Sequence, residues 1–394
     1  MKSQQPLRIV VLIDALGWRC VEGRPFLNDL LPHRQPLRTV LGFSSGAIPA
    51  ILTGVSPSVN GHWNLFYYDP QGSPFRWLRY LQFLPDAVLD HRITRKVMKE
   101  LGRRVLGMGP LFECCVSPRL LANFNWVEKR NIYDRGGISG APSIFDQMAE
   151  EDVPYRVYSY HHSTDVEILR QAEQDIRNKE AQFYFLYLSE MDMFLHMHCH
   201  EPERIEERLD WYDQALRKVF RAARQVDSEA IFTVISDHGM TPVRDHFDLV
   251  KKIDELGFQM PKDYLAVYDS TMARFWFFNE GACQSVTQHL RELKCGHIVP
   301  DEELKRLGVF FADRRFGELV FLLQPGWILS ESDFNGKGWA PRGMHGYHPD
   351  DSYSDAIFLT NAKPRNSMQE IAEVHEFMEH LVGITNTPEE STAR

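Results

Sequence analysis

Short apolar runs alternate along this chain with longer stretches in which apolar residues recur every three to four positions. The short runs predict β-strands at Ile9–Ile13, Leu37–Leu41, Tyr155–Tyr160, Phe183–Leu188, Ile231–Ser236, Met272–Phe278, Leu319–Leu323 and Ala356–Thr360. The longer stretches predict helices at Ala47–Leu52, Pro202–Gln225, Leu249–Leu256, Ser285–Leu293 and Met368–Leu381. Strands that alternate with helices predict an α/β fold with a mostly parallel central sheet and helices on both of its faces.

Two segments depart from this alternation. The first, Phe75 to about Ile138, is rich in aromatic and basic residues and predicts an insertion over about residues 71–138. The second, about Lys251 to Trp339, has strand–helix–strand signals of its own and predicts an inserted cap subdomain over residues 251–339. We expect residues 1–250 and 340–394 to form the catalytic core, because a chain of 394 residues is long enough for a core with such additions.

Composition and charge narrow the range of partners. Hydrophobic residues make up 43% of the chain and aromatic residues 12%, which is enough for a sizeable core. The net charge of −10 argues against binding to nucleic-acid polymers or anionic membranes. No apolar run approaches the roughly 18 residues of a membrane span. The six cysteines form no CxxC pair, which is typical of reduced thiols, so we expect a cytoplasmic protein.

Aspartates and histidines follow several of the predicted strands. Asp14 follows IVVLI, Asp192 follows FYFLYLSEM with His196 one helical turn later, Asp237 and His238 follow IFTVIS, and His345 lies in the loop RGMHGYHP. Because ligands gather beyond the carboxyl ends of parallel strands, we expect these six side chains to converge. Mixed Asp and His ligation suits two divalent ions, Zn²⁺ first and Mn²⁺ as the alternative. For any one of these aspartates taken alone, a helix cap or a turn is the commoner role.

A candidate nucleophile lies in the segment Gly42–Gly54, GFSSGAIPAILTG, which follows a predicted strand and opens a predicted helix. A serine at the start of this helix is next to unpaired N–H groups, and the helix dipole stabilises an anion there. Ser44 and Ser45 both fit this description. The alternative is that either serine only caps the helix, although capping and catalysis are compatible.

Taken together, these motifs resemble the type I phosphodiesterase/nucleotide pyrophosphatase branch of the alkaline-phosphatase superfamily. The matching pieces are Asp14 in LIDALGW, TGVSPSVNGHW at Thr53–Trp63, YDP at Tyr68–Pro70, Asp192-x-x-x-His196, SDHGM at Ser236–Met240, and His345 in GMHGY. The resemblance implies one metal held by Asp192, His196 and His345, and a second held by Asp14, Asp237 and His238. It also implies a nucleophile ten residues before Gly54, which is Ser44 with Ser45 as the alternative, bridging the two metals.

Two positions depart from the family pattern. The family's phosphoryl-binding asparagine falls on Leu65, with Asn64 beside it, and Asn60 stands where the family usually has a histidine. We predict that Asn64 takes over the contact to the phosphoryl oxygen, the alternative being that another group does so.

The resemblance implies a metal-dependent hydrolase that cleaves a small phosphate ester through a phosphoserine. The alternatives with the same ligands are a phosphomonoesterase, a phosphonate C–P hydrolase and a phosphotransferase. A degenerate, metal-dependent binding module is the non-enzymatic alternative.

Overall fold

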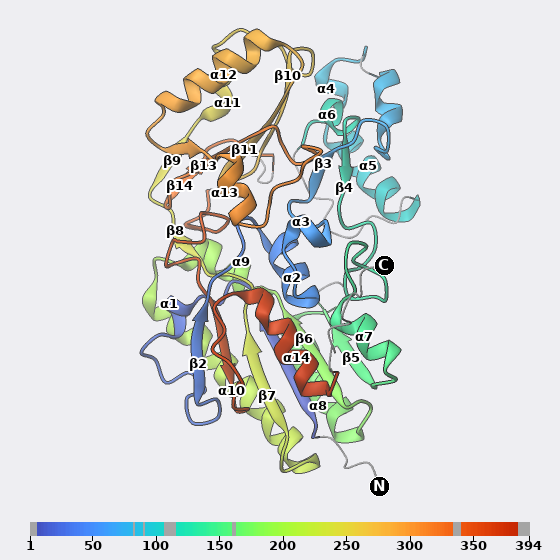
Figure 1. The fold of residues 1–394 in the computed structure, drawn as a ribbon, viewed down its shortest axis with the longest axis vertical. Coiled ribbons are helices and arrows are strands. Elements are labelled where there is room, and N and C mark those ends of the chain that lie inside the picture. Colours follow the sequence, from blue (N-terminus) through green and yellow to red (C-terminus); the bar gives the residue numbers. More distant parts are fainter. Residues whose placement is uncertain are drawn as a thin grey trace, which may run out of the picture.

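The computed structural model describes residues 6–81, 83–89, 91–105, 116–159, 163–333 and 340–384. Its centre is a six-stranded sheet with the strand order β2-β16-β7-β1-β6-β5 (Figure 1). These strands are β1 Arg8–Ile13, β2 His33–Leu37, β5 Tyr155–Tyr158, β6 Phe183–Leu188, β7 Ile231–Ile235 and β16 Ala356–Thr360. β1, β5, β6 and β7 are parallel, whereas β16 runs antiparallel to both of its neighbours. The prediction of an α/β fold with a mostly parallel sheet is confirmed.

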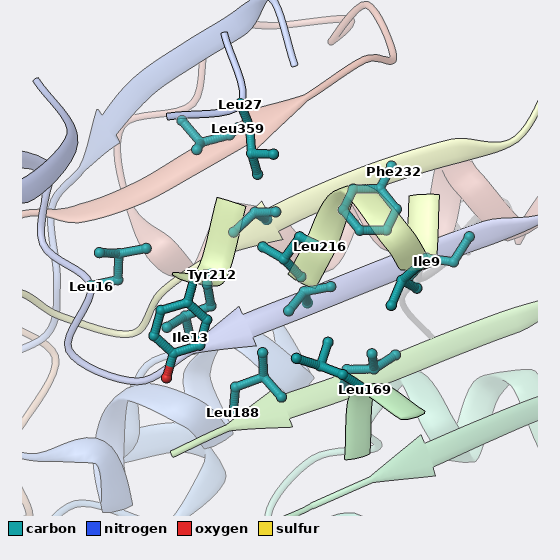
Figure 2. Close-up of a cluster of buried hydrophobic side chains, with 14 of the residues drawn as sticks. Ile9, Ile13, Leu16, Leu27, Leu169, Leu188, Tyr212, Leu216, Phe232 and Leu359 are labelled. Atoms are coloured by element: carbon teal, nitrogen blue, oxygen red, sulfur yellow. The ribbon is translucent and has the colours of Figure 1, made fainter. Parts of the chain in front are cut away.

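Both faces of the central sheet are covered by helices, and the sequence of β1 shows why. All six residues of RIVVLI are buried, and successive side chains point to opposite faces. Ile9 and Ile13 pack against α8 (Asp165–Asn178) and α10 (Pro202–Val226), as Figure 2 shows. On the other face, Val10 and Leu12 pack with α2 (Ser44–Thr53), α7 (Ile144–Glu150) and α14 (Val374–Val382). A strand buried on both faces reads as a continuous apolar run, which is how the sequence identified it.

Several predicted elements are wrong in position; the helix predicted at Ser285–Leu293, for example, is α12 and spans Glu280–Glu292. The strand predicted at Leu37–Leu41 is β2 at His33–Leu37, an edge strand in which only Leu37 is buried, so no apolar run marks it. Leu41 lies in the loop before α2 and packs in the cluster with Phe43 and Trp63. Its apolar character therefore reflects burial of a loop residue, not a strand. The helix predicted from Met368 begins later, with the 3₁₀ turn η2 at Ile371–Glu373.

A second, antiparallel sheet has the order β10-β11-β13-β12 and lies in the upper part of Figure 1. Its strands are β10 Tyr264–Tyr268, β11 Met272–Phe277, β12 Gly296–Ile298 and β13 Leu319–Leu323. One face packs against α11 (Leu249–Asp254) and α12 (Glu280–Glu292). The other packs against the ribbon of β3 (Phe66–Tyr68) and β4 (Phe124–Trp126). The division into a core at 1–250 and 340–394, an insertion at 71–138 and a cap at 251–339 stays a prediction.

The remaining elements connect these layers. They are α1 Trp18–Val21, α3 Pro57–Asn60, η1 Arg76–Leu81, α4 Asp86–Leu89, α5 Arg92–Val105, α6 Pro118–Leu121, α9 Glu190–His198, β8 Thr241–Pro242, β9 Asp245–Phe247, α13 Asp301–Arg306, β14 Trp327–Leu329 and β15 Gly343–Met344. Among the described residues, no helix combines the length and the apolar character that crossing a membrane requires.

Candidate metal centre and nucleophile

The six predicted ligand residues meet beyond the carboxyl ends of β1, β6 and β7. They form two groups, Asp192, His196 and His345 in one and Asp14, Asp237 and His238 in the other. Within each group the potential ligand atoms all lie within 4.8 Å of one another. The segments that follow β1, β6, β7 and β15 therefore each contribute one or two candidate ligands at the same edge of the sheet. Ligands of parallel sheets bind at this edge, beyond the carboxyl ends of the strands.

The first group is centred on the carboxylate of Asp192. Its Oδ1 lies 3.3 Å from His196 Nε2 and 3.5 Å from His345 Nε2. Asp192 and His196 are one turn apart on α9, so both face the same point. His196 Nδ1 donates to the carbonyl oxygen of Gly343 at 2.8 Å. With the proton held on Nδ1, Nε2 presents its lone pair to the site, as in metal-ligating histidines.

The second group has the same construction. His238 Nε2 lies 3.2 Å from Asp237 Oδ2 and 3.6 Å from Asp14 Oδ1. His238 Nδ1 donates to the carbonyl oxygen of Gly239 at 2.9 Å, which again leaves Nε2 as the acceptor. The rings of His238 and His345 stack with centroids 3.8 Å apart, so the two groups are in direct contact.

The charges of this site fit divalent cations. Asp14 Oδ1, Asp192 Oδ1 and Asp237 Oδ2 are buried and accept no hydrogen bond from the part of the chain that the structure describes. Burial, with the charges of Asp237 and Asp192, raises the pKa of Asp14 well above its ordinary value. Buried carboxylate oxygens that lack donors are unfavourable unless a positive charge is added. The donor set of carboxylate oxygens and imidazole nitrogens suits zinc-like ions.

His345 is also prepared for ligation. Burial and the neighbouring His238 lower the pKa of His345 well below its ordinary value, which favours the neutral imidazole that binds a metal. Burial opposes the ionised form of Asp192. The neighbouring histidines, His196 first, nevertheless hold the pKa of Asp192 below its ordinary value, so this carboxylate stays ionised.

Several supporting residues have no sequence signal that sets them apart. The hydroxyl of Tyr187 on β6 donates to Asp14 Oδ2. The N–H of Ala15 donates to Asp237 Oδ1 at 3.2 Å, and Ala15 adopts a positive φ of 60° to do so. Gly17 lets the loop after β1 touch the loop after β7, because a Cβ there would lie 2.7 Å from Gly239 Cα. Their roles depend on contacts between strands that no local pattern encodes.

The two candidate serines point to different surroundings. Ser44 is the first residue of α2, and its Oγ lies 3.0 Å from His238 Nε2, to which it donates. Ser45 is buried, and its hydroxyl donates to the carbonyl oxygen of Trp63 at 2.8 Å. Phe43, the residue before the helix, makes no side-chain cap. The structure therefore brings Ser44 to the ligand groups and leaves Ser45 in a packing role.

The positions that depart from the family pattern have clear surroundings. Asn64 is 1% exposed, its Oδ1 has no hydrogen-bond partner among the described residues, and its Nδ2 reaches only Met272 Sδ at 3.7 Å. Leu65 instead packs with the apolar cluster beneath the β3–β4 ribbon. Asn60 is fully buried and closes its turn by accepting from the N–H of His62 at 2.8 Å. Asn64 is thus a buried amide next to the loop before α2, since its Oδ1 would lie 3.9 Å from a Cβ at Gly42, and Asn60 is structural.

Comparisons with known proteins agree with this geometry. The family model of type I phosphodiesterase/nucleotide pyrophosphatase matches residues 9–348. A search of curated protein sequences finds no match. Among solved structures, human ectonucleotide pyrophosphatase/phosphodiesterase 5 has a TM-score of 0.69 at 14% identity, over 98% of this chain and 96% of that one. An inactive form of the murine protein, in complex with AMP, has a TM-score of 0.68 at 16% identity, with the same coverage.

Phosphonoacetate hydrolase from Sinorhizobium meliloti 1021, in complex with phosphonoacetate, has a TM-score of 0.64 at 12% identity over 96% of each chain. At these identities the likeness to solved structures concerns the fold.

Proposed function

The chain belongs to the type I phosphodiesterase/nucleotide pyrophosphatase family of phosphoester hydrolases, and on that basis we propose that it cleaves a small phosphate ester through Ser44. The observation that carries this proposal is the position of Ser44 Oγ, 3.0 Å from His238 Nε2 at the amino end of α2. A binding module needs neither this hydroxyl nor two complete ligand groups. The ligands named for two structural neighbours, AMP and phosphonoacetate, support a small substrate.

The family is metal-dependent, and we propose two divalent ions, Zn²⁺ with Mn²⁺ as the alternative. Asp192, His196 and His345 would hold one, and Asp14, Asp237 and His238 the other, with Ser44 as a further ligand next to His238. When bound, the two cations supply positive charge to phosphoryl oxygens and favour ionisation of an adjacent hydroxyl.

The residues of the chain do the remaining work. In the first turn of α2 the N–H groups of Gly46 and Ala47 donate to the carbonyl oxygen of Phe43 at 2.8 and 3.1 Å. The N–H groups of Ser44 and Ser45, which open the helix, are the ones that favour negative charge at Ser44 and on a phosphoryl group. The Ser44 oxygen forms a bond to phosphorus and its proton passes to solvent, while the leaving oxygen departs as an alkoxide with the electrons of the broken P–O bond and takes a proton from solvent. Water then attacks phosphorus, breaks its bond to Ser44 and returns a proton to the Ser44 oxygen; a diester substrate thereby releases a phosphate monoester, and a monoester releases phosphate. Asn64, buried beside this loop, is proposed to donate its amide to a phosphoryl oxygen.

A substrate panel tests the proposal. Metal-free protein is supplied with Zn²⁺ or Mn²⁺ and given bis-p-nitrophenyl phosphate, p-nitrophenyl phosphate or phosphonoacetate. We expect the diester to be cleaved fastest, two ions to bind per chain, and chelation to abolish turnover. Faster turnover of the monoester or of phosphonoacetate would make the enzyme a phosphomonoesterase or a phosphonate hydrolase. Transfer to added glycerol would identify a phosphotransferase. If two ions bind but no substrate is turned over, the protein is a metal-dependent binding module and not an enzyme.

We also propose a cytoplasmic location. The four cysteines within the described residues, Cys20, Cys199, Cys283 and Cys295, are free thiols. Free thiols are typical of a reducing compartment. Microscopy of the chain with a small C-terminal tag in its own cell tests this assignment, and export of the tagged protein would refute it.

A further inference from the structure

Helix α9 carries two of the proposed metal ligands but has no side-chain cap of its own. It runs from Glu190 to His198, with Asp192 in its first turn and His196 in its second. Ser189, the residue before the helix, makes no capping hydrogen bond through its hydroxyl. The first N–H groups of a helix need acceptors, and a nine-residue helix is unstable without such support.

The missing acceptors come from a different helix. Asp165, the first residue of α8, is 1% exposed and turns its carboxylate to α9. Its Oδ1 accepts the N–H of Ser189 at 3.0 Å, and its Oδ2 accepts the N–H of Glu190 at 3.4 Å. The amino end of α8 does not need this carboxylate, because Thr164 and Glu167 already form a capping box there.

The arrangement is reciprocal and extends to a third helix. Glu190 Oε1 accepts the N–H of Asp165 at 3.2 Å, so each helix start caps the other. Tyr212 on α10 donates its hydroxyl to Asp165 Oδ2 at 2.5 Å. Arg208, also on α10, donates to Glu190 Oε2 at 2.9 Å, with its guanidinium 5.0 Å from the centre of the Tyr212 ring. The buried carboxylate of Asp165 and the half-buried carboxylate of Glu190 thus hold the starts of α8 and α9 against α10.

We propose that Asp165 is a positioning residue for the metal group of Asp192, His196 and His345. This inference rests on the ligand assignment in the proposed function. Asp192 is the third residue of α9, so loosening the first turn moves its carboxylate relative to His345, which comes from a distant loop. His196 is held separately by Gly343, one turn further on. The group of Asp14, Asp237 and His238 receives no ligand from α9, so Asp165 should affect it less.

The test compares Asp165→Ala with a matched control, Asp146→Ala. Asp146 is also buried and forms the capping box of α7, a helix without proposed ligands. Metal-free protein is titrated with Zn²⁺ against a competing chelator, and amide hydrogen exchange is followed across residues 189–193 before metal is added. We expect Asp165→Ala to weaken one of the two Zn²⁺ sites about tenfold or more and to speed exchange at the start of α9. Asp146→Ala should change neither.

A second background identifies which site is affected. In Asp192→Ala the remaining Zn²⁺ should bind with the same affinity whether or not Asp165 is also replaced. The positioning role is refuted if Asp165→Ala binds both ions with the affinity of the unmodified protein. It is also refuted if the affinities for both ions fall only as much as they do in Asp146→Ala. Should Asp165→Ala fail to fold, Asp165→Asn keeps one acceptor, and the same two readouts decide. Absence of Zn²⁺ binding in the unmodified chain refutes the proposed function, while exchange at residues 189–193 still reports whether Asp165 caps α9.

Discussion

The neighbouring residues Ser44 and Ser45 should respond to alanine in opposite ways. Ser44 Oγ faces His238 Nε2 at 3.0 Å, whereas Ser45 Oγ is buried and donates to Trp63 O at 2.8 Å. Ser44→Ala should therefore remove activity with little effect on folding, and Ser45→Ala should weaken folding with little effect on activity. The pair is its own control, because both changes delete one hydroxyl from the same turn.

The two substitutions should differ by orders of magnitude in their effect on kcat. Loss of a covalent nucleophile should lower kcat roughly 10³-fold or more, equivalent to about 4 kcal/mol of transition-state stabilisation. The free energy of unfolding of metal-free Ser44→Ala should stay within about 0.5 kcal/mol of the unmodified protein, because Ser44 is only half-buried and its hydroxyl faces His238. Ser45→Ala loses one buried hydrogen bond and leaves the Trp63 carbonyl without that donor, which should cost about 1–2 kcal/mol. Its kcat should remain within about tenfold.

Two assays measure these effects. Turnover of bis-p-nitrophenyl phosphate gives kcat, and urea unfolding of the metal-free proteins gives stability. Acid quenching during turnover, followed by peptide mapping, should place a p-nitrophenyl phosphoryl group on Ser44. The same group on Ser45, or a Ser45→Ala variant without activity, would refute the assignment of the two hydroxyls. If both variants retain full activity, the covalent mechanism itself is wrong.

Two further predictions concern the frame around the site. Gly17→Ala places a Cβ 2.7 Å from Gly239 Cα, so it should lower the free energy of unfolding by about 1–3 kcal/mol and weaken one of the two Zn²⁺ sites. Urea unfolding and metal titration measure these effects, and an unchanged Zn²⁺ affinity would mean that the loops after β1 and β7 are not coupled. Burial lowers the pKa of His62 from 6.5 to about 4, so below pH 6.5 the unfolded chain takes up a proton that the folded protein does not, and stability falls as the pH drops. His62→Gln should remove roughly 2 kcal/mol of the stability change between about pH 7 and pH 5 in urea unfolding, and an unchanged pH dependence would contradict this reasoning.

Local patterns in the sequence determined the elements of the central sheet and the ligand types. RIVVLI reads as a strand buried on both faces, and its side chains do pack on both. The spacing of Asp192 and His196 reads as one helical turn, and α9 has them on one turn. These features depend on residues close together in the chain, so periodicity reveals them. The strand predicted at Leu37–Leu41 failed for the same reason, because an apolar loop residue such as Leu41 looks locally like a strand residue.

Only the tertiary structure decided which of several adjacent side chains reaches the site. Ser44 and Ser45 are about 100° apart around α2, so the packing of that helix, not its sequence, selects the one that faces His238. Asn64 and Leu65 also differ in their surroundings: Asn64 is a buried amide next to Gly42 in the loop before α2, and Leu65 packs in an apolar cluster. Asp165 lies in a different helix from the ligands that it supports, and its carboxylate gains that role only when α8 and α9 meet at α10. Such contacts join residues far apart in the chain, and their geometry depends on how whole elements pack.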